Sequence, residues 1–337
     1  MAVRSAATRA LLRSAALRAP RRPFAIHPSL CRHHVLAMGL LLSSASLLLT
    51  STEARNDMAL GRVFEDDYDL AMTKTLGAGA FGMVLQCVEK QNQSIAAVKV
   101  SADSLEEAVR EKTALGCVAM AGGHDHIVHM KNHYTHDGFH YLVIEYVPGS
   151  TLFDYMLHRR RLDEVEAKRV LSQIASALAF IHAHGMVHCD LKPDNIMLTD
   201  DDGRVKLIDF GSATIPDPHT SSMPLQRAMR LASAPLSGTK SYWSPEMLAA
   251  EPAPVVAAMD MWALGCILYI MITGVHPFDP RGSLSEDEIQ AAILCKDVDF
   301  PIAQWYLVSK ETKAIVRGLL EKDPRKRLSA ATLLSLL

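Results

Sequence analysis

The first folded part of the chain alternates hydrophobic and polar positions, as strands do. In residues 70–76 and 81–88 apolar or small side chains alternate with polar ones, β-branched residues recur, and glycines lie between the two segments. A third short apolar run, residues 94–100, ends beside a lysine. The pattern predicts three strands, of which the first two form a hairpin.

Helical spacing replaces this alternation further along the chain. Residues 105–119 predict a helix with one apolar face interrupted by Lys112; that face comprises Leu105, Ala108, Val109 and Leu115. After residue 167 long helical patterns dominate, and Met259–Ile272 is apolar on nearly all sides, as a buried helix is. A further amphipathic helix is predicted from Val170, Ile174, Leu178 and Ile181. We therefore expect a small strand-rich lobe followed by a larger helical lobe.

Composition limits the class of protein. The 337 residues carry 35 lysines and arginines against 37 aspartates and glutamates, and this formal charge of −2 argues against a strongly basic nucleic-acid binder. The six cysteines are scattered without a CxxC pair, so neither a disulfide scaffold nor a structural zinc site is indicated. The sequence also lacks the runs of about 18 uniformly apolar residues that mark a polytopic membrane protein.

The first 50 residues differ from the rest of the chain. They contain seven arginines and no acidic residue, whereas residues 51–337 contain 28 basic and 37 acidic side chains. An Arg-, Ala- and Ser-rich segment without acids is typical of an organellar transit peptide. The apolar stretch Val35–Thr50 also suits a signal-peptide core or an anchor, although it is short for a membrane span. We interpret residues 1–60 as a leader, with mitochondrial-type targeting first, membrane anchoring second and a disordered segment third.

The first chemical motif is the glycine-rich stretch Gly77-Ala78-Gly79-Ala80-Phe81-Gly82. Glycines allow backbone N–H groups to approach phosphate oxygens closely. Dinucleotide-binding folds use GxGxxG as well, but they need a helix after it, whereas residues 83–89 continue as an alternating strand. An ordinary glycine turn is the alternative. Lys99, in Ala97-Val98-Lys99 on the next strand, favours the phosphate-binding interpretation because it supplies a cation for the same phosphates.

Two further motifs carry acidic and amide side chains. Residues 188–195 (HCDLKPDN) contain Asp190 and Asn195, and Asp209-Phe210-Gly211 follows a strand-like run. Two carboxylates and an amide in this order are the groups that phosphoryl transfer on magnesium needs. Each element alone is common in loops, and His188 by itself indicates a packed, hydrogen-bonded histidine. Their order after a glycine loop and a strand lysine predicts one shared site.

On these motifs, residues 68–337 resemble a eukaryotic protein kinase domain of the Ser/Thr type. The resemblance implies an α+β, two-lobed protein kinase-like fold, with an antiparallel-sheet N-lobe and one main helix in residues 68–147 and a larger, mostly helical C-lobe in residues 148–337. In the family, the arginine matched by Arg327 pairs with the glutamate matched by Glu246. Further matches are Gly238-Thr239, Tyr242, Ser244-Pro245-Glu246, Asp260–Gly265 and His276-Pro277-Phe278.

The resemblance implies ATP and Mg²⁺ as cofactors. Val84 and Ala97 would sandwich the adenine, and Lys99 would hold the α- and β-phosphates. Ile144 matches the back of the adenine pocket. The residues implied to contact the nucleotide and its metal are Gly77, Ala78, Gly79, Gly82, Val84, Ala97, Lys99, the hinge residues Glu145 and Val147, Asn195 and Asp209.

The resemblance also assigns the chemistry. Asp190 would accept the hydrogen bond of the substrate hydroxyl, Lys192 would neutralise the transferring phosphoryl group, and Asn195 and Asp209 would hold magnesium. Lys192 and Thr239 are typical of the branch that phosphorylates serine and threonine. We expect transfer of the γ-phosphoryl group of Mg-ATP to protein substrates in signal transduction, by a monomeric domain that binds no nucleic acid beyond ATP.

Spacing leaves three candidates for the glutamate that pairs with Lys99. Glu111 is the first choice, and it would complete the catalytic set with Asp190, Lys192 and Lys99. It follows Lys99 by only 12 residues, which is short for the family. Glu106 and Glu107 are therefore rivals.

Cys189 marks a non-RD variant of the catalytic loop, because it stands where many members have arginine. In those members the arginine contacts a phosphate on the activation segment. Cysteine cannot make that contact. We therefore expect that activity does not depend on phosphorylation of residues 209–246.

Other classes of function compete with an active kinase. Loss of Lys99, Asp190 or Asp209 would have favoured a pseudokinase scaffold, but all three are present, so this class ranks second. A membrane-anchored interaction protein rests on the leader alone and ranks third. A cytoplasmic kinase domain is the expected location, with mitochondrial targeting or membrane anchoring through residues 1–50 as alternatives. Six histidines between residues 124 and 140 have no fixed ligand spacing, so solvated hairpin histidines are preferred over a metal site.

Overall fold

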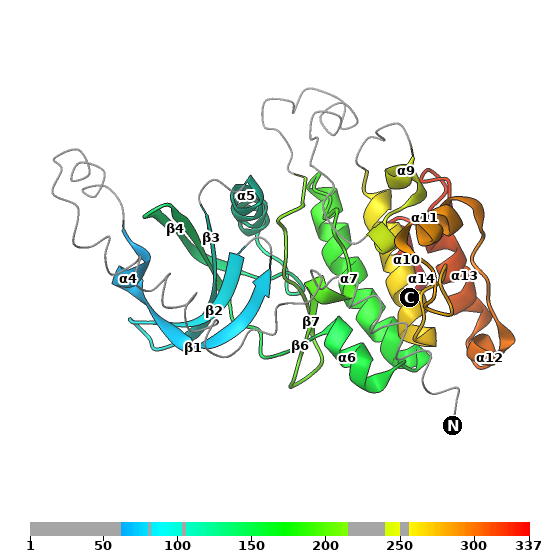
Figure 1. The fold of residues 1–337 in the computed structure, drawn as a ribbon, viewed down its shortest axis with the longest axis horizontal. Helices are drawn as coiled ribbons and strands as arrows, with labels where there is room; N and C mark the ends of the chain where they lie inside the picture. Colours follow the sequence, from blue (N-terminus) through cyan, green and yellow to red (C-terminus); the bar gives the residue numbers. More distant parts are fainter. Residues whose placement is uncertain (1–61, 80–81, 103–105, 215–239, 250–255) are drawn as a thin grey trace. The chain divides into compact units, whose positions relative to one another are not determined.

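The computed structural model describes residues 62–79, 82–102, 106–214, 240–249 and 256–337. The expected leader, residues 1–60, and most of the segment between Asp209 and Glu246 lie outside these ranges. The chain divides into two units (Figure 1). Among the described residues, the sheet unit comprises the chain up to Val109 and Met130–Tyr146, and the helical unit comprises Arg110–His129 and the chain from Val147 onward.

The sheet unit is built on five antiparallel strands in the order β1-β2-β3-β5-β4. They are β1 (Tyr68–Gly79), β2 (Gly82–Glu89), β3 (Ile95–Ala102), β4 (Met130–His136) and β5 (Phe139–Glu145). The pairing of β1 with β2 continues to Gly79 opposite Gly82. The predicted strand-turn-strand is thus confirmed, and the glycine stretch ends one strand and begins the next.

One face of this sheet packs on an aromatic cluster. The short helix α4 (Phe64–Asp67) precedes β1 and buries Phe64 completely. The ring of Phe64 stacks on that of Tyr141 with 5.2 Å between centroids, and Tyr68 stacks on the Phe64 ring at 5.5 Å. The core of the unit also includes Leu85, Cys87, Ala96, Val98, Val100, Tyr134 and Val143. Since side chains alternate across a strand, the neighbouring positions face away from this cluster.

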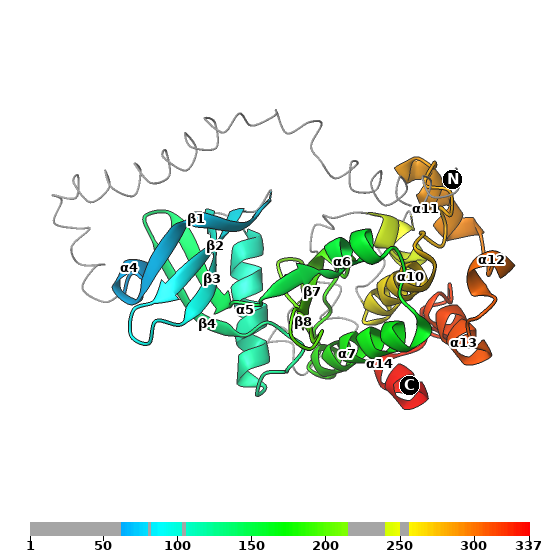
Figure 2. The ribbon, with the colours of Figure 1, turned by 90° about the horizontal axis from the view of Figure 1, so that it is seen from below.

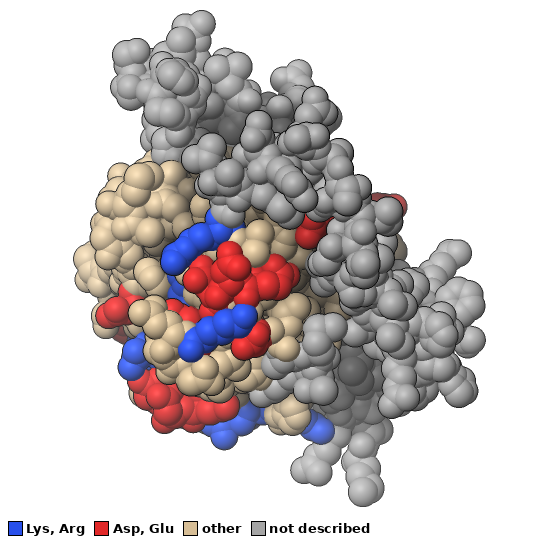
Figure 3. Space-filling model, turned by 90° about the vertical axis from the view of Figure 1, so that its left-hand side faces the viewer, with Lys and Arg blue, Asp and Glu red and all other residues tan. Residues whose placement is uncertain are grey.

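Charged side chains cover the end of the sheet that carries α4. Acidic groups gather there between lysines and arginines (Figure 3). The ammonium of Lys90 lies 3.4 Å from a carboxylate oxygen of Asp69, and Arg62 lies 3.8 Å from Asp67. Exposed pairs of this kind contribute about 0–1 kcal/mol, so the aromatic core beneath them carries the stability of this end.

The helix predicted over residues 105–119 is α5 (Glu106–Met120). Ala108 and Leu115 are buried as expected. Val109 is 46% exposed, so the prediction that it lies on the inner face was wrong. The buried stripe instead runs through Ala108, Glu111, Leu115 and Val118. The three- and four-residue steps of this stripe place the Glu111 carboxylate inside and Val109 outside.

The helical unit is organised around α10 (Ala258–Thr273), whose side chains from Met259 to Thr273 are all buried, as its uniform apolar sequence predicts. On α7 (Glu164–Ala183) the predicted inward positions are at most 1% exposed, which confirms that helix. Helix α10 packs against α7 and α13 (Lys310–Leu319), and α14 (Ala330–Leu336) packs on α7 (Figure 2). The remaining helices are α6 (Leu152–Arg159), α9 (Pro245–Leu248), α11 (Glu286–Cys295) and α12 (Ile302–Trp305).

A second, smaller sheet lies within the helical unit. Its antiparallel strands are β6 (Gly149–Thr151), β7 (Ile196–Thr199) and β8 (Val205–Leu207), in that order. A parallel bridge between Ile127 and Leu207 continues it beyond β8. Among the described residues, no helix is long and apolar enough to cross a membrane.

The interpretation of the histidines as solvated hairpin residues was wrong for three of them. His124 and His126 precede β4 and are half-buried: His124 bonds the hydroxyl of Ser176 at 3.1 Å, and His126 bonds the carbonyl of Val205 at 3.1 Å. His136 stacks on Tyr141 with 4.5 Å between ring centroids. The partners of His124 and His126 lie 52 and 79 residues further along the chain, and spacing alone does not show such contacts.

Candidate active site

Three of the predicted catalytic-loop side chains meet directly. The ammonium of Lys192 contacts a carboxylate oxygen of Asp190. The amide nitrogen of Asn195 donates to the same oxygen, Oδ2, at 3.1 Å and to the Asp190 carbonyl at 2.8 Å. Asp190 is half-buried, so its carboxylate keeps some access to solvent. The predicted grouping of a carboxylate, a cation and an amide is therefore present in the fold.

The backbone of this loop is anchored by Asp260, which is 1% exposed on α10. Its carboxylate accepts the N–H of His188 at 2.8 Å and that of Cys189 at 2.9 Å, and it bonds Nε2 of His182 at 2.8 Å. Burial acts to raise the pKa of Asp260, but the bond and charge of His182 and the contacts with His188 outweigh it and hold the pKa below its ordinary value. Asp260 thus stays ionised and ties the loop to the core.

The two residues before Asp190 are buried. His188 is fully buried, and its ring lies 5.0 Å from that of Phe210. Cys189 has φ of +65°, an uncommon conformation for a residue with a side chain. Its thiol lies 3.6 Å from the Val187 carbonyl and packs with Val187 and Met259. Burial, followed by the charge of Asp260, raises the pKa of the Cys189 thiol well above its ordinary value, so the group is a neutral apolar contact.

Asp209 lies two residues beyond β8. The N–H of Gly211 donates to its Oδ1 at 3.0 Å. Arg110 of α5 donates to the Gly211 carbonyl at 3.2 Å. The N–H of Ile208 donates to the carbonyl of Asn195 at 3.1 Å, which links the chain beside Asp209 to the chain at Asn195. The two predicted metal-ligand positions are therefore tied together through the backbone.

In the sheet unit, the predicted nucleotide-binding side chains share one face. Val84 on β2 lies opposite Lys99 on β3, and Ala97 precedes Lys99 by two residues on the same strand. Ile144 on β5 lies opposite Ala97. Partners directly opposite and positions two apart point to the same side of a sheet, so these four lie on the face away from the aromatic cluster.

Gly82 needs to be glycine for a steric reason. Its φ is +136°, and a Cβ placed there would lie 2.2 Å from the carbonyl oxygen of Val100. Gly77 lies opposite Val84 at the other end of this glycine segment, and Ala78 lies opposite Met83. The hairpin backbone therefore runs beside the face that carries Val84 and Lys99.

The remaining predicted residues fall into both units. Glu145 ends β5 in the sheet unit, and Val147 is half-buried in the helical unit. Glu111 is 2% exposed on α5, whereas Glu106 is exposed and Glu107 is half-buried. A carboxylate as buried as that of Glu111 requires a compensating partner.

Two residues that hold the loops of the candidate site were not predicted from the sequence. Asp260 was noted only as part of a matching stretch, although an aspartate within an otherwise apolar helix is a signal that could have identified it. Arg110 acts on a backbone carbonyl 101 residues away, and no sequence spacing reports such a contact. Both residues organise the loops and do not supply reacting groups.

Comparison with known proteins agrees with this arrangement. The model of the protein kinase domain family matches residues 70–336. The serine/threonine-protein kinase PKZ1 of Phytophthora infestans is 34% identical over 286 residues, 77% of this chain and 67% of that protein. Ribosomal protein S6 kinase alpha-4 of Homo sapiens is 34% identical over 82% of this chain, and calcium/calmodulin-dependent protein kinase type II of Caenorhabditis elegans is 33% identical over 79%. The match spans 35% of each of these last two proteins.

The chain therefore belongs to the protein kinase family. Its relatives place it in the eukaryotic serine/threonine branch, whose members transfer phosphoryl groups from ATP to protein hydroxyls.

Proposed function

We propose that the catalytic loop and Asp209 form the phosphoryl-transfer site of a kinase that phosphorylates serine and threonine in proteins with Mg-ATP. The observation that carries this assignment is the contact of Asp190 with both Lys192 and Asn195. Asp260 fixes the backbone of the same loop from the core. A carboxylate base, a cation and an amide are thereby held ready in a preorganised geometry.

Nucleotide binding is assigned to the sheet face described above. The backbone of the glycine hairpin covers the phosphates, Val84 and Ala97 enclose the adenine, and Lys99 holds the α- and β-phosphates. The shared face of Val84, Ala97 and Lys99 supports this assignment. The full nucleotide set is Gly77, Ala78, Gly79, Gly82, Val84, Ala97, Lys99, Glu145 and Val147.

Protein kinases use ATP and typically Mg²⁺, and the donor atoms here suit that ion. Both side-chain bonds of Asn195 use its amide nitrogen, so its metal ligand would be the amide oxygen. The carboxylate of Asp209 supplies the second ligand position. Oxygen donors of these two types are those that Mg²⁺ prefers. When bound, the metal neutralises charge on the phosphate oxygens.

The protein's own groups then carry the transfer. Asp190 accepts the hydrogen bond of the substrate hydroxyl and orients its oxygen for in-line attack on the γ-phosphorus. Lys192, already beside Asp190, stabilises the negative charge of the transferring phosphoryl group. Glu111 is the partner proposed for Lys99, and its burial favours it over Glu106 and Glu107.

We also propose the domain limits given by the sequence. The kinase domain extends over residues 68–337, and its N-lobe ends near residue 147. The family match over residues 70–336 and the division of the units between Tyr146 and Val147 support these limits. The domain acts as a monomer on protein substrates, and for the leader of residues 1–60 mitochondrial-type targeting ranks first, membrane anchoring second and a disordered segment third. If alkaline washing of membranes released the protein into the supernatant, that result would contradict membrane anchoring.

The test of function is transfer of labelled γ-phosphate from Mg-ATP to a generic basic protein and to the kinase itself. The full chain is compared with Asp190→Asn. We expect transfer by the parent and a loss of at least 10²-fold in kcat in the variant, as about 10²–10⁴-fold is typical for a general base. ATP binding without transfer by the parent would instead support a pseudokinase scaffold.

A further inference from the structure

The hairpin formed by β7 and β8 connects the two proposed metal ligands. Asn195 immediately precedes β7, and Asp209 follows β8 by two residues. Strand β8 has only three residues, Val205–Leu207, so a shift of its first residue is passed on to Asp209 within one short segment. The position of this hairpin therefore sets the position of the Asp209 carboxylate.

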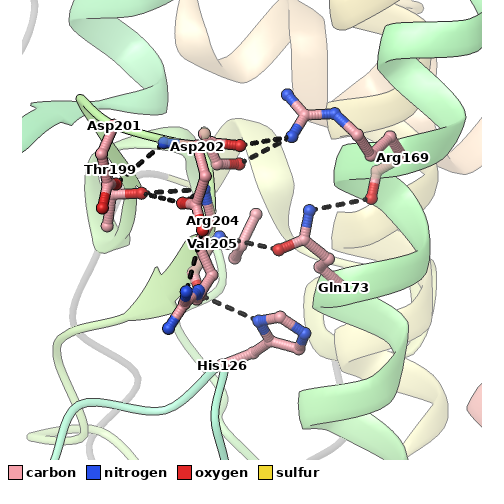
Figure 4. A network of polar contacts seen from close by, with 9 residues as sticks. His126, Arg169, Gln173, Thr199, Asp201, Asp202, Arg204 and Val205 are labelled. Atoms are coloured by element: carbon pink, nitrogen blue, oxygen red, sulfur yellow. Dashed lines mark hydrogen bonds and ion pairs between the residues drawn. The ribbon is translucent and has the colours of Figure 1, made fainter.

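Arg169 of α7 holds the turn of this hairpin. Its Nη1 donates to the carbonyl of Asp202 at 2.9 Å and to that of Gly203 at 3.2 Å (Figure 4). Gly203 has φ of +62°, and a Cβ placed there would lie 2.7 Å from Nη2 of Arg169. The glycine thus allows the guanidinium to lie directly against the turn, where it satisfies two backbone acceptors.

Gln173, one helical turn further along α7, holds the start of β8. Its Oε1 accepts the N–H of Val205 at 2.9 Å, and its Nε2 donates to the carbonyl of Arg169 at 3.3 Å. Figure 4 shows Gln173 and Arg169 projecting from the same helix toward the hairpin. Val205 is fully buried, so its N–H would be costly to leave without an acceptor.

The turn is braced internally, and this makes it a stiff unit for α7 to hold. The hydroxyl of Thr199 donates to Asp202 at 2.7 Å, and the guanidinium of Arg204 donates to the other carboxylate oxygen of Asp202 at 2.8 Å. The bonds from Thr199 and Arg204 lower the pKa of Asp202, so its carboxylate stays charged over the working range. On the edge of β8 that does not pair with β7, the N–H of Leu207 donates to the His126 carbonyl at 2.9 Å.

We propose that Arg169 and Gln173 are positioning residues of the kinase reaction. They hold the β7–β8 hairpin on α7 and thereby fix Asp209 relative to Asn195. The inference rests on the proposed function, since it assumes that these two residues bind the magnesium of Mg-ATP. Neither residue belongs to the set assigned above to the nucleotide, the metal or the substrate. Their effect is therefore on metal dependence, as for residues that orient metal ligands from outside the coordination sphere.

The test uses the full chain with two substitutions at one position. Gln173→Met keeps the length of the side chain and removes both polar groups, whereas Gln173→Glu keeps an oxygen that accepts the Val205 N–H. ATP affinity is measured by calorimetry at several Mg²⁺ concentrations, and activity is measured over the same range. We expect Gln173→Met to raise the Mg²⁺ concentration for half-maximal ATP binding and activity about tenfold, and Gln173→Glu to restore it to within about threefold of the parent.

A control separates positioning from loss of stability. Ser285→Ala removes the cap of α11, whose Glu288 N–H bonds the Ser285 hydroxyl at 3.3 Å, and Ser285 bonds neither α7 nor the hairpin. We expect it to lower thermal stability and to leave the Mg²⁺ dependence unchanged. Unchanged Mg²⁺ dependence in Gln173→Met, or an equal shift in Ser285→Ala, would overturn the inference. An Asp190→Asn variant as active as the parent would overturn the proposed function instead.

Discussion

Arg327 and Glu246 form a bidentate ion pair: Nη1 lies 2.6 Å from Oε1 and Nη2 lies 2.9 Å from Oε2. The side chain of Arg327 is fully buried, and Nη1 also donates to the carbonyl of Ala258 at 2.7 Å. The pair expected from the family resemblance is confirmed. It ties the chain after α13 to α9 and to the first residue of α10.

Removing one partner of this pair should be strongly destabilising. We expect Arg327→Met to lower the free energy of unfolding by about 3–5 kcal/mol, because it leaves the Glu246 carboxylate without its main partner. Arg325→Met is the matched control. Arg325 bonds Asp323 at 2.9 Å, but its side chain is 87% exposed, so we expect no measurable change in the free energy of unfolding. Urea unfolding followed by tryptophan fluorescence measures both, and equal effects would contradict the prediction.

Asp260→Asn should impair catalysis although Asp260 lies behind the catalytic loop. An amide lacks the negative charge that holds the N–H groups of His188 and Cys189 and the ring of His182. Displacement of a loop by about 1 Å costs on the order of 10²-fold in rate, so we expect a loss of this size in kcat. Steady-state kinetics give the result. Asp287→Asn, on the exposed first turn of α11, should leave kcat unchanged, and an unaffected Asp260→Asn enzyme would disprove the anchoring role.

Activity should not require phosphate on the activation segment. Cys189 is a neutral thiol packed against Val187 and Met259, and it offers no cation to a phosphate. We expect a combined alanine variant to retain most of the parent's kcat in a peptide phosphorylation assay, with mass spectrometry confirming that the segment carries no phosphate. Near-complete loss of activity would contradict this expectation. The variant replaces Thr220, Ser221, Ser222, Ser233 and Ser237.

His276 should make stability fall in mild acid. Burial, only partly opposed by the bond to the Ser241 carbonyl, lowers the pKa of His276 to about 4 from an ordinary value of 6.5. The neutral ring bonds the Ser241 carbonyl at 2.9 Å and accepts the Phe278 N–H at 3.3 Å, and a proton on the accepting nitrogen would break the second bond.

Between pH 6.5 and 4 the unfolded chain therefore binds a proton at this position that the folded chain does not. The contribution of His276 to the free energy of unfolding is fully present above pH 6.5. It declines by on the order of 2–3 kcal/mol as the pH falls toward 4. Urea unfolding at several pH values should show a flatter profile for His276→Gln. His158→Gln, at the exposed end of α6, should follow the parent, and a parent-like profile for His276→Gln would refute the assignment.

The sequence predicted the elements whose burial pattern is unambiguous. Strands β1 and β2 followed from alternation around the glycines, and α10 followed from an apolar run that leaves no polar face. The prediction went wrong where a polar side chain is buried. Residues 105–119 were assigned an apolar face that includes Val109 and is interrupted only by Lys112, whereas the buried stripe carries the carboxylate of Glu111.

Contacts between side chains and distant backbone were beyond prediction for a physical reason. Arg169 bonds carbonyls 33 and 34 residues away, and His126 bonds one 79 residues away. Every residue presents the same carbonyl group, so such a contact imposes no requirement on the identity of its partner. The grouping of Asp190, Lys192 and Asn195 could be foreseen because all three lie within six residues of one loop.

The buried ring of Phe64 determines where a shortened form of this protein can begin. A fragment starting at Tyr68 would retain every strand but would lose the ring that stacks on Tyr141. Removing a buried phenylalanine side chain leaves a cavity and lowers the free energy of unfolding by about 3–5 kcal/mol, which is a large share of the stability of an ordinary domain. Proteolysis or gene truncation that extends through α4, up to the start of β1, would thus turn a folded sheet into one prone to opening and aggregation.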